Sequence, residues 1–191
     1  MSRPDRFEFE FAPSALRGPN EGAAFSPCRR YRYALWRMWA PEKPYINFIL
    51  LNPSTADEHA NDPTIERQVR RVKGWEGKAQ MSAWKAGGIV VTNAYAWRAT
   101  NPEALKRLRS TGIDPIGPDN AKALITFATG AALVICGWGT HCDEVIPGCG
   151  AAIEALLRLA GVTPHALGMN LDGSPQHPLY LPYDRVPEVM L

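Results

Sequence analysis

The chain has no hydrophobic run long enough to cross a membrane and no recognisable export signal. No stretch approaches the roughly 18 consecutive apolar residues of a membrane-spanning helix. The first residues, MSRPDRFEFEF, carry charges where a signal peptide has its apolar core. The sequence therefore predicts a cytoplasmic protein without a membrane partner, and it leaves the oligomeric state open.

Several catalytic motifs are also missing. The chain contains no G-x-x-x-x-G-K-[ST] loop, no G-x-G-x-x-G turn and no G-x-S-x-G elbow, which argues against a kinase, a hydride-transfer enzyme and a serine hydrolase. No C-x-x-C pair occurs among its four cysteines. Because structural zinc sites usually show such pairs, His141, Cys142 and Cys149 are not expected to bind a metal. No cofactor is predicted.

The bulk composition is that of an ordinary globular protein. Hydrophobic residues make up 46% of the 191 residues, charged residues 21%, and the net charge is +2. This small charge neither requires nor forbids nucleic acid as a partner. The length fits one domain. We expect a single domain over residues 28–191, preceded by a flexible arm over residues 1–27, which is rich in proline, glycine and serine.

Three apolar runs each end in polar residues that can hydrogen-bond a ligand. They lie at residues 48–57 (FILLNPSTAD), 89–98 (IVVTNAYAWR) and 133–141 (LVICGWGTH). Such runs are typical of buried parallel strands, and open α/β folds bind ligands at the carboxyl edge of the sheet. Helix-start signals separate the runs, so the sequence predicts a three-layer α/β/α domain with a mainly parallel central sheet.

Two further expectations concern elements at the start of the domain. Asp62-Pro63 and Asn101-Pro102 each combine an N-cap residue with a proline suited to the first helical turn. The aromatic and basic segment Arg29–Trp39 is expected to be an additional antiparallel strand. Because only a short turn separates it from the strand at 45–51, an antiparallel hairpin is expected between the two.

The strand-end residues form the candidate site. Asn52 and Asn93 carry both donors and acceptors, so either can bind a base edge or orient a water molecule. Pro53 and Ser54 follow Asn52, and a simple turn accounts for this segment equally well. Tyr95 and Trp138 are suited to stacking on a planar ligand, with core packing as the equal alternative.

Charged residues near the same strand ends complete the candidate list. Asp57 has no evident capping role and is therefore preferred over Asp62 for a role in the site. Arg98 is suited to bidentate binding of phosphate or carboxylate, with an ordinary ion pair as the alternative. His177 can donate to a developing anion or move a proton, unless it is a solvated loop histidine. His141 is the final residue of the segment 133–141 and is expected to contact the ligand.

The motifs as a set resemble one family. The segments LNPSTAD (51–57), NDPT (61–64), TNAYAWRATNP (92–102), GPDN (117–120) and DGSPQHPLYLP (172–182), with W-G-x-H at 138–141, are similar to those of the bacterial and phage "domain of unknown function 1643" family. The resemblance covers about residues 28 to 184. It implies a family and no activity.

A second resemblance, to the uracil-DNA glycosylase superfamily, implies a fold and a reaction. Asn52-Pro53 resembles the first motif of the mismatch-specific branch, and His177-Pro178 resembles the late histidine loop, although Leu51 and Leu179 depart from those patterns. The resemblance implies a glycosylase-like layout and N-glycosidic bond hydrolysis. In that case Asn52, helped by Asp57, holds the water, Asn93 binds the base and His177 supports the leaving base.

The same resemblance implies the partners. These are a nucleobase, nucleotide or nucleic acid, with phosphate contacts from some of Arg29, Arg30, Arg32 and Arg37. Because alternate residues of a strand face opposite sides, these four arginines cannot all share one surface. The competing class is a nucleotide- or modified-base-binding module without glycosylase activity, and a purely structural protein is a third.

Overall fold

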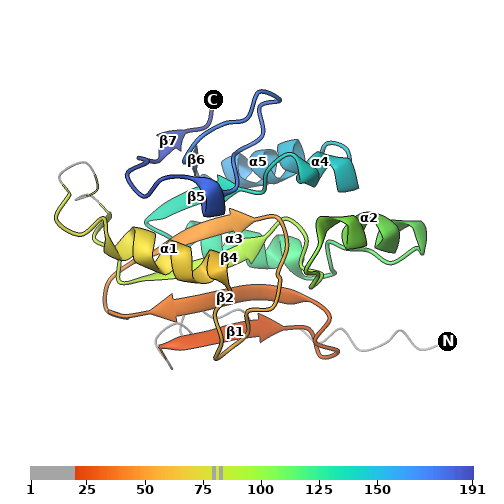
Figure 1. Cartoon of the computed structure of the whole chain (residues 1–191), viewed down its shortest axis with the longest axis horizontal. Helices are drawn as coiled ribbons and strands as arrows, with labels where there is room; N and C mark the ends of the chain where they lie inside the picture. Colours follow the sequence, from red (N-terminus) through yellow and green to blue (C-terminus); the bar gives the residue numbers. More distant parts are fainter. Residues whose placement is uncertain (1–19, 79–80, 82–83) are drawn as a thin grey trace.

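Four parallel strands form the centre of the sheet in the computed structural model, which describes residues 20–78, 81 and 84–191 (Figure 1). They are β3 (Tyr45–Leu50), β4 (Gly88–Asn93), β5 (Leu133–Gly137) and β6 (Pro164–Ala166). Their order in the sheet is β4-β3-β5-β6. Every residue of β3, β4 and β5 is buried, as expected of parallel strands covered on both faces.

Antiparallel strands flank this parallel centre. β2 (Arg32–Met38) pairs with β4, with Leu35 opposite Val91, and β1 (Glu21–Phe25) pairs with β2. At the other edge, β7 (Glu188–Val189) pairs with β6. The domain is α/β as predicted, but its seven-stranded sheet is mixed rather than mainly parallel.

Two expectations about the start of the domain are wrong. β2 and β3 do not form a hairpin, because β4 lies between them. The boundary at residue 27 is also wrong, because β1 belongs to the sheet and buries Ala24 and Phe25. The remaining residues of the expected arm, 1–19, lie outside the described residues.

The capping signals predicted the starts of two helices correctly. Asp62 accepts a hydrogen bond from the Ile65 N–H at the start of α1 (Pro63–Lys73), and Asn101 accepts one from the Glu103 N–H at the start of α2 (Pro102–Ser110). The other helices are α3 (Asn120–Thr129), α4 (His141–Val145), α5 (Cys149–Leu159) and the 3-10 helix η3 (Pro178–Tyr180). None of the described helices is long and apolar enough to span a membrane.

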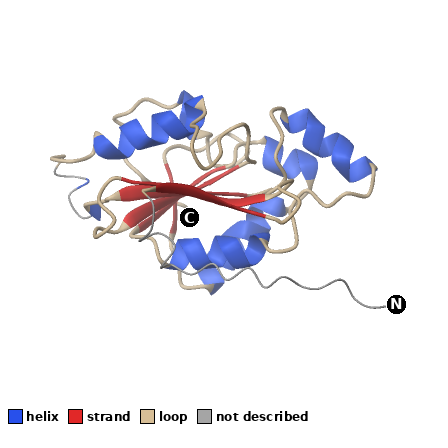
Figure 2. Cartoon of the chain, turned by 90° about the horizontal axis from the view of Figure 1, so that it is seen from below, coloured by secondary structure: helices blue, strands red, loops and turns tan. Residues whose placement is uncertain are grey.

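Helices cover both faces of the sheet (Figure 2). On one face, Ile65 of α1 packs in a cluster with Phe48 and Ile135. On the other, α3, α5 and the sheet share a cluster that contains Leu124, Leu157 and Ile49. Each such side chain contributes roughly 1.5–3 kcal/mol through burial. Helices thus pack on both faces, and the strand ends with their loops form the edge at which open α/β sheets bind ligands.

Candidate functional site

A buried arginine and a buried asparagine lie at the carboxyl edge of the parallel strands. Arg32 begins β2 and Asn93 ends β4, and the antiparallel pairing brings these positions together. Arg32 is 2% exposed and Asn93 1%. The Arg32 Nη1 donates to the Ala56 carbonyl at 2.9 Å, and Nη2 donates to the Asn93 Oδ1 at 3.3 Å. We call these two side chains the Arg32–Asn93 pair.

The Arg32–Asn93 pair carries more hydrogen-bond donors than the described residues around it accept. The Arg32 Nε and the Asn93 Nδ2 are buried and have no acceptor among the described residues. No described carboxylate lies within ion-pair distance of Arg32, and burial lowers its pKa to about 10 against the raising effect of Asp62. Leaving a buried donor unpaired costs about 1–3 kcal/mol. The pair is therefore suited to a ligand rich in acceptors.

His177 is held as a neutral ring near the same edge. Burial lowers the pKa of His177 to about 4, although the charge of Asp62 raises it. Its Nδ1 accepts a hydrogen bond from the Leu179 N–H at 3.4 Å. An accepting Nδ1 carries no proton, so at pH 7 the ring bears its single proton on Nε2. His177 thus offers a neutral N–H donor.

Asp62 lies within electrostatic reach of both Arg32 and His177. Its Oδ1 caps α1 through the Ile65 N–H at 2.9 Å, and the residue is 8% exposed. The helix cap alone explains the presence of Asp62 in the sequence, so no local signal indicated that its charge acts on both Arg32 and His177. Only the fold shows it.

Asn52 joins two loops of the edge. Its Nδ2 donates to the Pro53 carbonyl at 3.0 Å and to the Ala99 carbonyl at 2.6 Å, while the Ala99 N–H donates to the Pro53 carbonyl. Within the described residues its Oδ1 accepts no hydrogen bond. Asn52 therefore shapes the loop with its nitrogen and keeps one acceptor for a ligand.

Asp57 has a structural role that its sequence context did not indicate. Its Oδ1 accepts the N–H groups of His59 and Ala60 at 2.9 and 2.8 Å. These two bonds, above all, lower the pKa of the Asp57 carboxyl. The carboxylate closes a turn of the Asx type, and the expectation that Asp57 lacks such a role is wrong.

Three other candidates have partners elsewhere. Tyr95 is fully buried and donates its hydroxyl to the Cys142 carbonyl at 2.6 Å, and Trp138 is 3% exposed in the same apolar cluster. Both positions follow the core-packing alternative, and neither ring presents a face to a ligand. His141, at the start of α4, is exposed and lies 2.8 Å from the Glu144 carboxylate through Nδ1.

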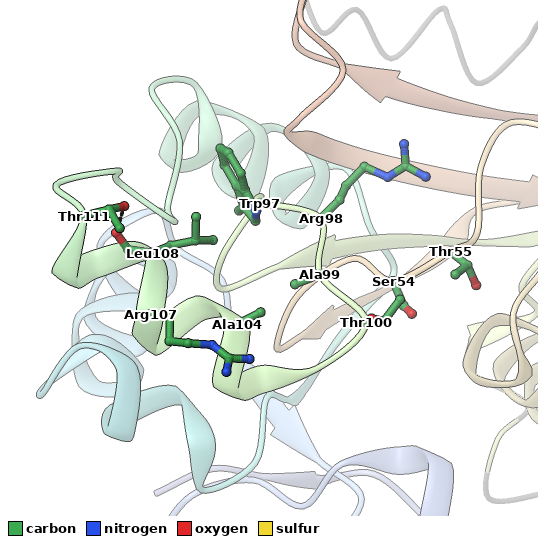
Figure 3. Close-up of a pocket in the computed structure, with 10 residues that line it drawn as sticks. All are labelled: Ser54, Thr55, Trp97, Arg98, Ala99, Thr100, Ala104, Arg107, Leu108 and Thr111. Atoms are coloured by element: carbon green, nitrogen blue, oxygen red, sulfur yellow. Dashed lines mark hydrogen bonds between the residues drawn. The ribbon is translucent and has the colours of Figure 1, made fainter.

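Arg98 and Ser54 line a cavity of about 620 Å³ (Figure 3). Thr55 and Arg107 also line it, so the β3–α1 loop, the segment after β4 and α2 all contribute. The Arg98 Nε is buried without an acceptor among the described residues, and the charge of Arg98 contributes to the lowered pKa of Arg32. The ion pair considered for Arg98 is absent from the described part of the chain.

No group of three or more His, Cys, Asp or Glu side chains among the described residues is placed to hold a metal ion. A protein-family model described as "Protein of unknown function (DUF1643)" matches residues 32–179. This range runs from Arg32 to just past His177 and so contains the whole candidate site. No curated protein and no solved structure matches the chain significantly.

Proposed function

We propose that this chain, which belongs to the DUF1643 family, is an enzyme directed at a nucleobase or nucleic acid. Its ligand binds where the Arg32–Asn93 pair, Asn52 and His177 approach the carboxyl edge of the sheet. The glycosylase-like layout of the layers and N-glycosidic bond hydrolysis as the reaction are part of this proposal.

One observation carries the proposal: two buried donors, the Arg32 Nε and the Asn93 Nδ2, have no acceptor among the described residues. Buried polar groups are almost always paired in folded proteins, so such exceptions mark places where a ligand completes the hydrogen bonding. Nucleobases carry ring nitrogens and carbonyl oxygens that accept such bonds. The Asn93 Nδ2 would donate to the base edge.

In the proposed reaction, water adds to the anomeric carbon of the sugar while the bond to the base nitrogen breaks. The bonding electrons go to the base, and a proton from the water ends on the base or in solvent. The Asn52 Oδ1 would orient the water, and the neutral His177 Nε2–H would stabilise the departing anion. Donors of this kind contribute roughly 3 kcal/mol to a barrier. Asparagine is a poor base, so the rate would depend on orientation.

A binding module without catalysis is the second candidate, and specific contacts favour it. The Asp57 carboxylate is engaged in its own turn, and the Asn52 nitrogen is engaged by two carbonyls. The turn contacts lower the pKa of the Asp57 carboxyl, which makes it a weaker base, and the Asn52 amide is a poor base. A protein that only binds a modified base or nucleotide needs the donors of the Arg32–Asn93 pair and no base.

One set of experiments distinguishes the enzyme from the binding module. Thermal unfolding is followed with free bases, nucleosides, nucleotides and short oligonucleotides, because a ligand of the folded state raises the Tm. Base release is then measured by chromatography on every ligand that binds. Under the enzyme proposal, Asn52→Ala and His177→Ala lower base release at least about a hundredfold while the Tm shift is largely kept.

The outcomes differ for each candidate. Binding without base release by the native chain supports the module and contradicts the enzyme. Unchanged base release in both variants would also refute the proposed roles. His59→Ala, which removes an exposed histidine, is the matched control and should release base at the native rate.

A further inference from the structure

The 620 Å³ cavity lined by Arg98 and Arg107 takes no part in the proposed bond cleavage (Figure 3). Its lining contains two arginines, Arg98 and Arg107, four hydroxyl side chains and no carboxylate. A space with cationic and hydroxyl donors and no acidic group is suited to anions.

Neither arginine forms an ion pair with a described residue, although the charge of Arg98 helps to lower the pKa of the Asp57 carboxyl. Arg98 and Arg107 make no side-chain hydrogen bond or ion pair with any residue that the structure describes, although the Arg98 guanidinium lies 5.1 Å from the Phe25 ring centroid. The acidic groups near α2 pair with Lys106 instead, whose Nζ lies 2.8 Å from carboxylate oxygens of both Glu103 and Glu144. The charges of Arg98 and Arg107 thus remain available to a ligand.

The cavity adjoins the Arg32–Asn93 pair along the β3–α1 loop. Ser54 and Thr55 line the cavity, and the next residue, Ala56, accepts a hydrogen bond from Arg32 through its carbonyl. We therefore expect a ligand whose base lies near the Arg32–Asn93 pair to place its charged part along this loop, in the cavity. The half-buried Trp97 and Leu108 add apolar surface to the lining, which is suited to sugar or base carbon atoms.

The two guanidinium groups lie on opposite sides of the segment from Ala99 to Thr100 (Figure 3). Several linked phosphate groups fit this arrangement better than a single phosphate. We infer that the cavity binds linked phosphates through Arg98 and Arg107, with Ser54 and Thr100 as hydroxyl donors. These phosphates belong either to a single strand of nucleic acid or to a nucleoside triphosphate. The assignment rests on the proposed function and deepens it by naming the charged part of the ligand.

The test compares Arg98→Gln and Arg107→Gln with the native chain and with Arg185→Gln. Arg185 is exposed and lines none of the cavities described for the chain, so it controls for the loss of one charge. Calorimetry measures binding of tripolyphosphate, a nucleoside, its triphosphate and a short single-stranded oligonucleotide. Each cavity variant should weaken binding of the phosphate-bearing probes about tenfold, and the control less than twofold. Thermal unfolding confirms that the variants are folded.

The salt dependence of the binding affinity distinguishes the two sources of phosphate. If single-stranded nucleic acid is the ligand, the logarithm of the affinity for the oligonucleotide falls steeply as the logarithm of the salt concentration rises. Each cavity variant then lowers the magnitude of that slope by about one. If a triphosphate is the ligand, it binds the native chain more tightly than the oligonucleotide does. Either result supports the assignment.

Other outcomes contradict the phosphate assignment, and they show separately whether the proposed function fails. Unchanged affinity in both cavity variants contradicts the phosphate assignment, as does equal affinity for a nucleoside and its triphosphate, and neither result touches the proposed function. Tripolyphosphate binding that the variants lose, with no binding of nucleosides or bases, supports the cavity and contradicts the proposed function. No binding of any probe to the native chain overturns both.

Discussion

Three buried arginines differ in how completely their hydrogen bonds are satisfied. Arg37 donates to four acceptors, and Arg71 donates to Gln68 and to three carbonyls. Arg32 has two acceptors and a buried Nε with none. A buried cation with a complete set of acceptors stabilises the fold, whereas an incomplete set leaves part of the desolvation cost uncompensated. Arg32 is therefore the one whose chemistry points to a ligand.

This difference predicts opposite consequences for a matched pair of substitutions. Arg32→Met should change the free energy of unfolding by less than about 1 kcal/mol, because the lost bonds and the relieved desolvation oppose each other. Arg37→Met should lower it by about 2–4 kcal/mol, because four acceptors lose their donor. Urea unfolding measures both.

The same pair tests the site. Ligands that raise the native Tm should no longer do so with Arg32→Met. A loss of stability in Arg32→Met as large as that in Arg37→Met would assign Arg32 a purely structural role.

His177 should make stability depend on pH in the mildly acidic range. Its pKa is about 4 in the folded chain and about 6.5 when unfolded. Between these values the unfolded chain binds the extra proton, so stability is fully present above pH 6.5 and falls as the pH drops toward 4. From pH 7 to pH 5 the loss is about 2 kcal/mol.

Urea unfolding at the two pH values measures this loss. His177→Gln should show a decline smaller by about that amount than the native chain. His59→Gln, at an exposed site, should match the native chain. Equal pH dependence of the native chain and His177→Gln would show that the ring does not stay neutral in the folded protein.

At the level of single residues, the sequence predicted some candidates better than others. Strand-end position was enough to place Asn93 at the edge, because the end of a buried strand is visible in the pattern. The ring directions of Tyr95 and Trp138 depend on packing against distant segments, which local patterns do not contain. Arg32 was one of four arginines in its segment, and its burial depends on which strand face meets the β3–α1 loop.

Among the elements, α1 and η3 form one structural unit. The Arg71 guanidinium on α1 donates to the carbonyls of Pro178, Leu181 and Pro182 at 2.6–3.0 Å. On the other side, a Cβ at Gly137 would lie 2.6 Å from the Pro178 Cδ, so only glycine lets the loop approach β5 this closely. The loop that carries His177 is thus held from two sides.

This contact predicts that Arg71→Met destabilises the chain by about 3 kcal/mol or more, because three carbonyls lose a charged donor. It should also raise amide hydrogen exchange over residues 176–182 relative to the rest of the chain. Arg70→Met, an exposed neighbour, is the control. Unaltered exchange in this loop would show that Arg71 does not hold it.

Helix starts were predictable and strand partners were not. A cap residue followed by proline determines a helix start through contacts within a few residues of sequence. Asp62-Pro63 and Asn101-Pro102 therefore predicted the starts of α1 and α2 correctly. Pairing depends on which strand fills each position of the sheet. The short connection between β2 and β3 favoured a hairpin, yet β4 occupies the position between them.

At the scale of the whole molecule, β1 closes one side of the sheet. It pairs with β2 from Arg32 to Arg37, and the ring centroid of its Phe25 lies 4.1 and 5.1 Å from the guanidinium groups of Arg29 and Arg98. Without β1, β2 becomes an edge strand with unpaired backbone groups that invite association. The sheet and the cavity arginine Arg98 therefore both depend on this strand.

Two shortened chains test that dependence. A chain that starts at Cys28 should unfold at lower urea concentration and associate more than one that starts at Asn20, because only the second retains β1. Light scattering and urea unfolding measure the difference. Identical behaviour of the two would show that β1 contributes nothing to the domain.

The position of β4 between β2 and β3 constrains how the chain can assemble during synthesis. β2 leaves the ribosome early, yet its only inward neighbour is made about fifty residues later. Until Asn93 has emerged, the first three strands cannot reach their final order, and the Arg32–Asn93 pair does not exist. The Arg32–Asn93 pair is consequently formed in the step that places β4 between β2 and β3, whereas His177 joins the candidate site only after the later strands and the loop that carries it have been made.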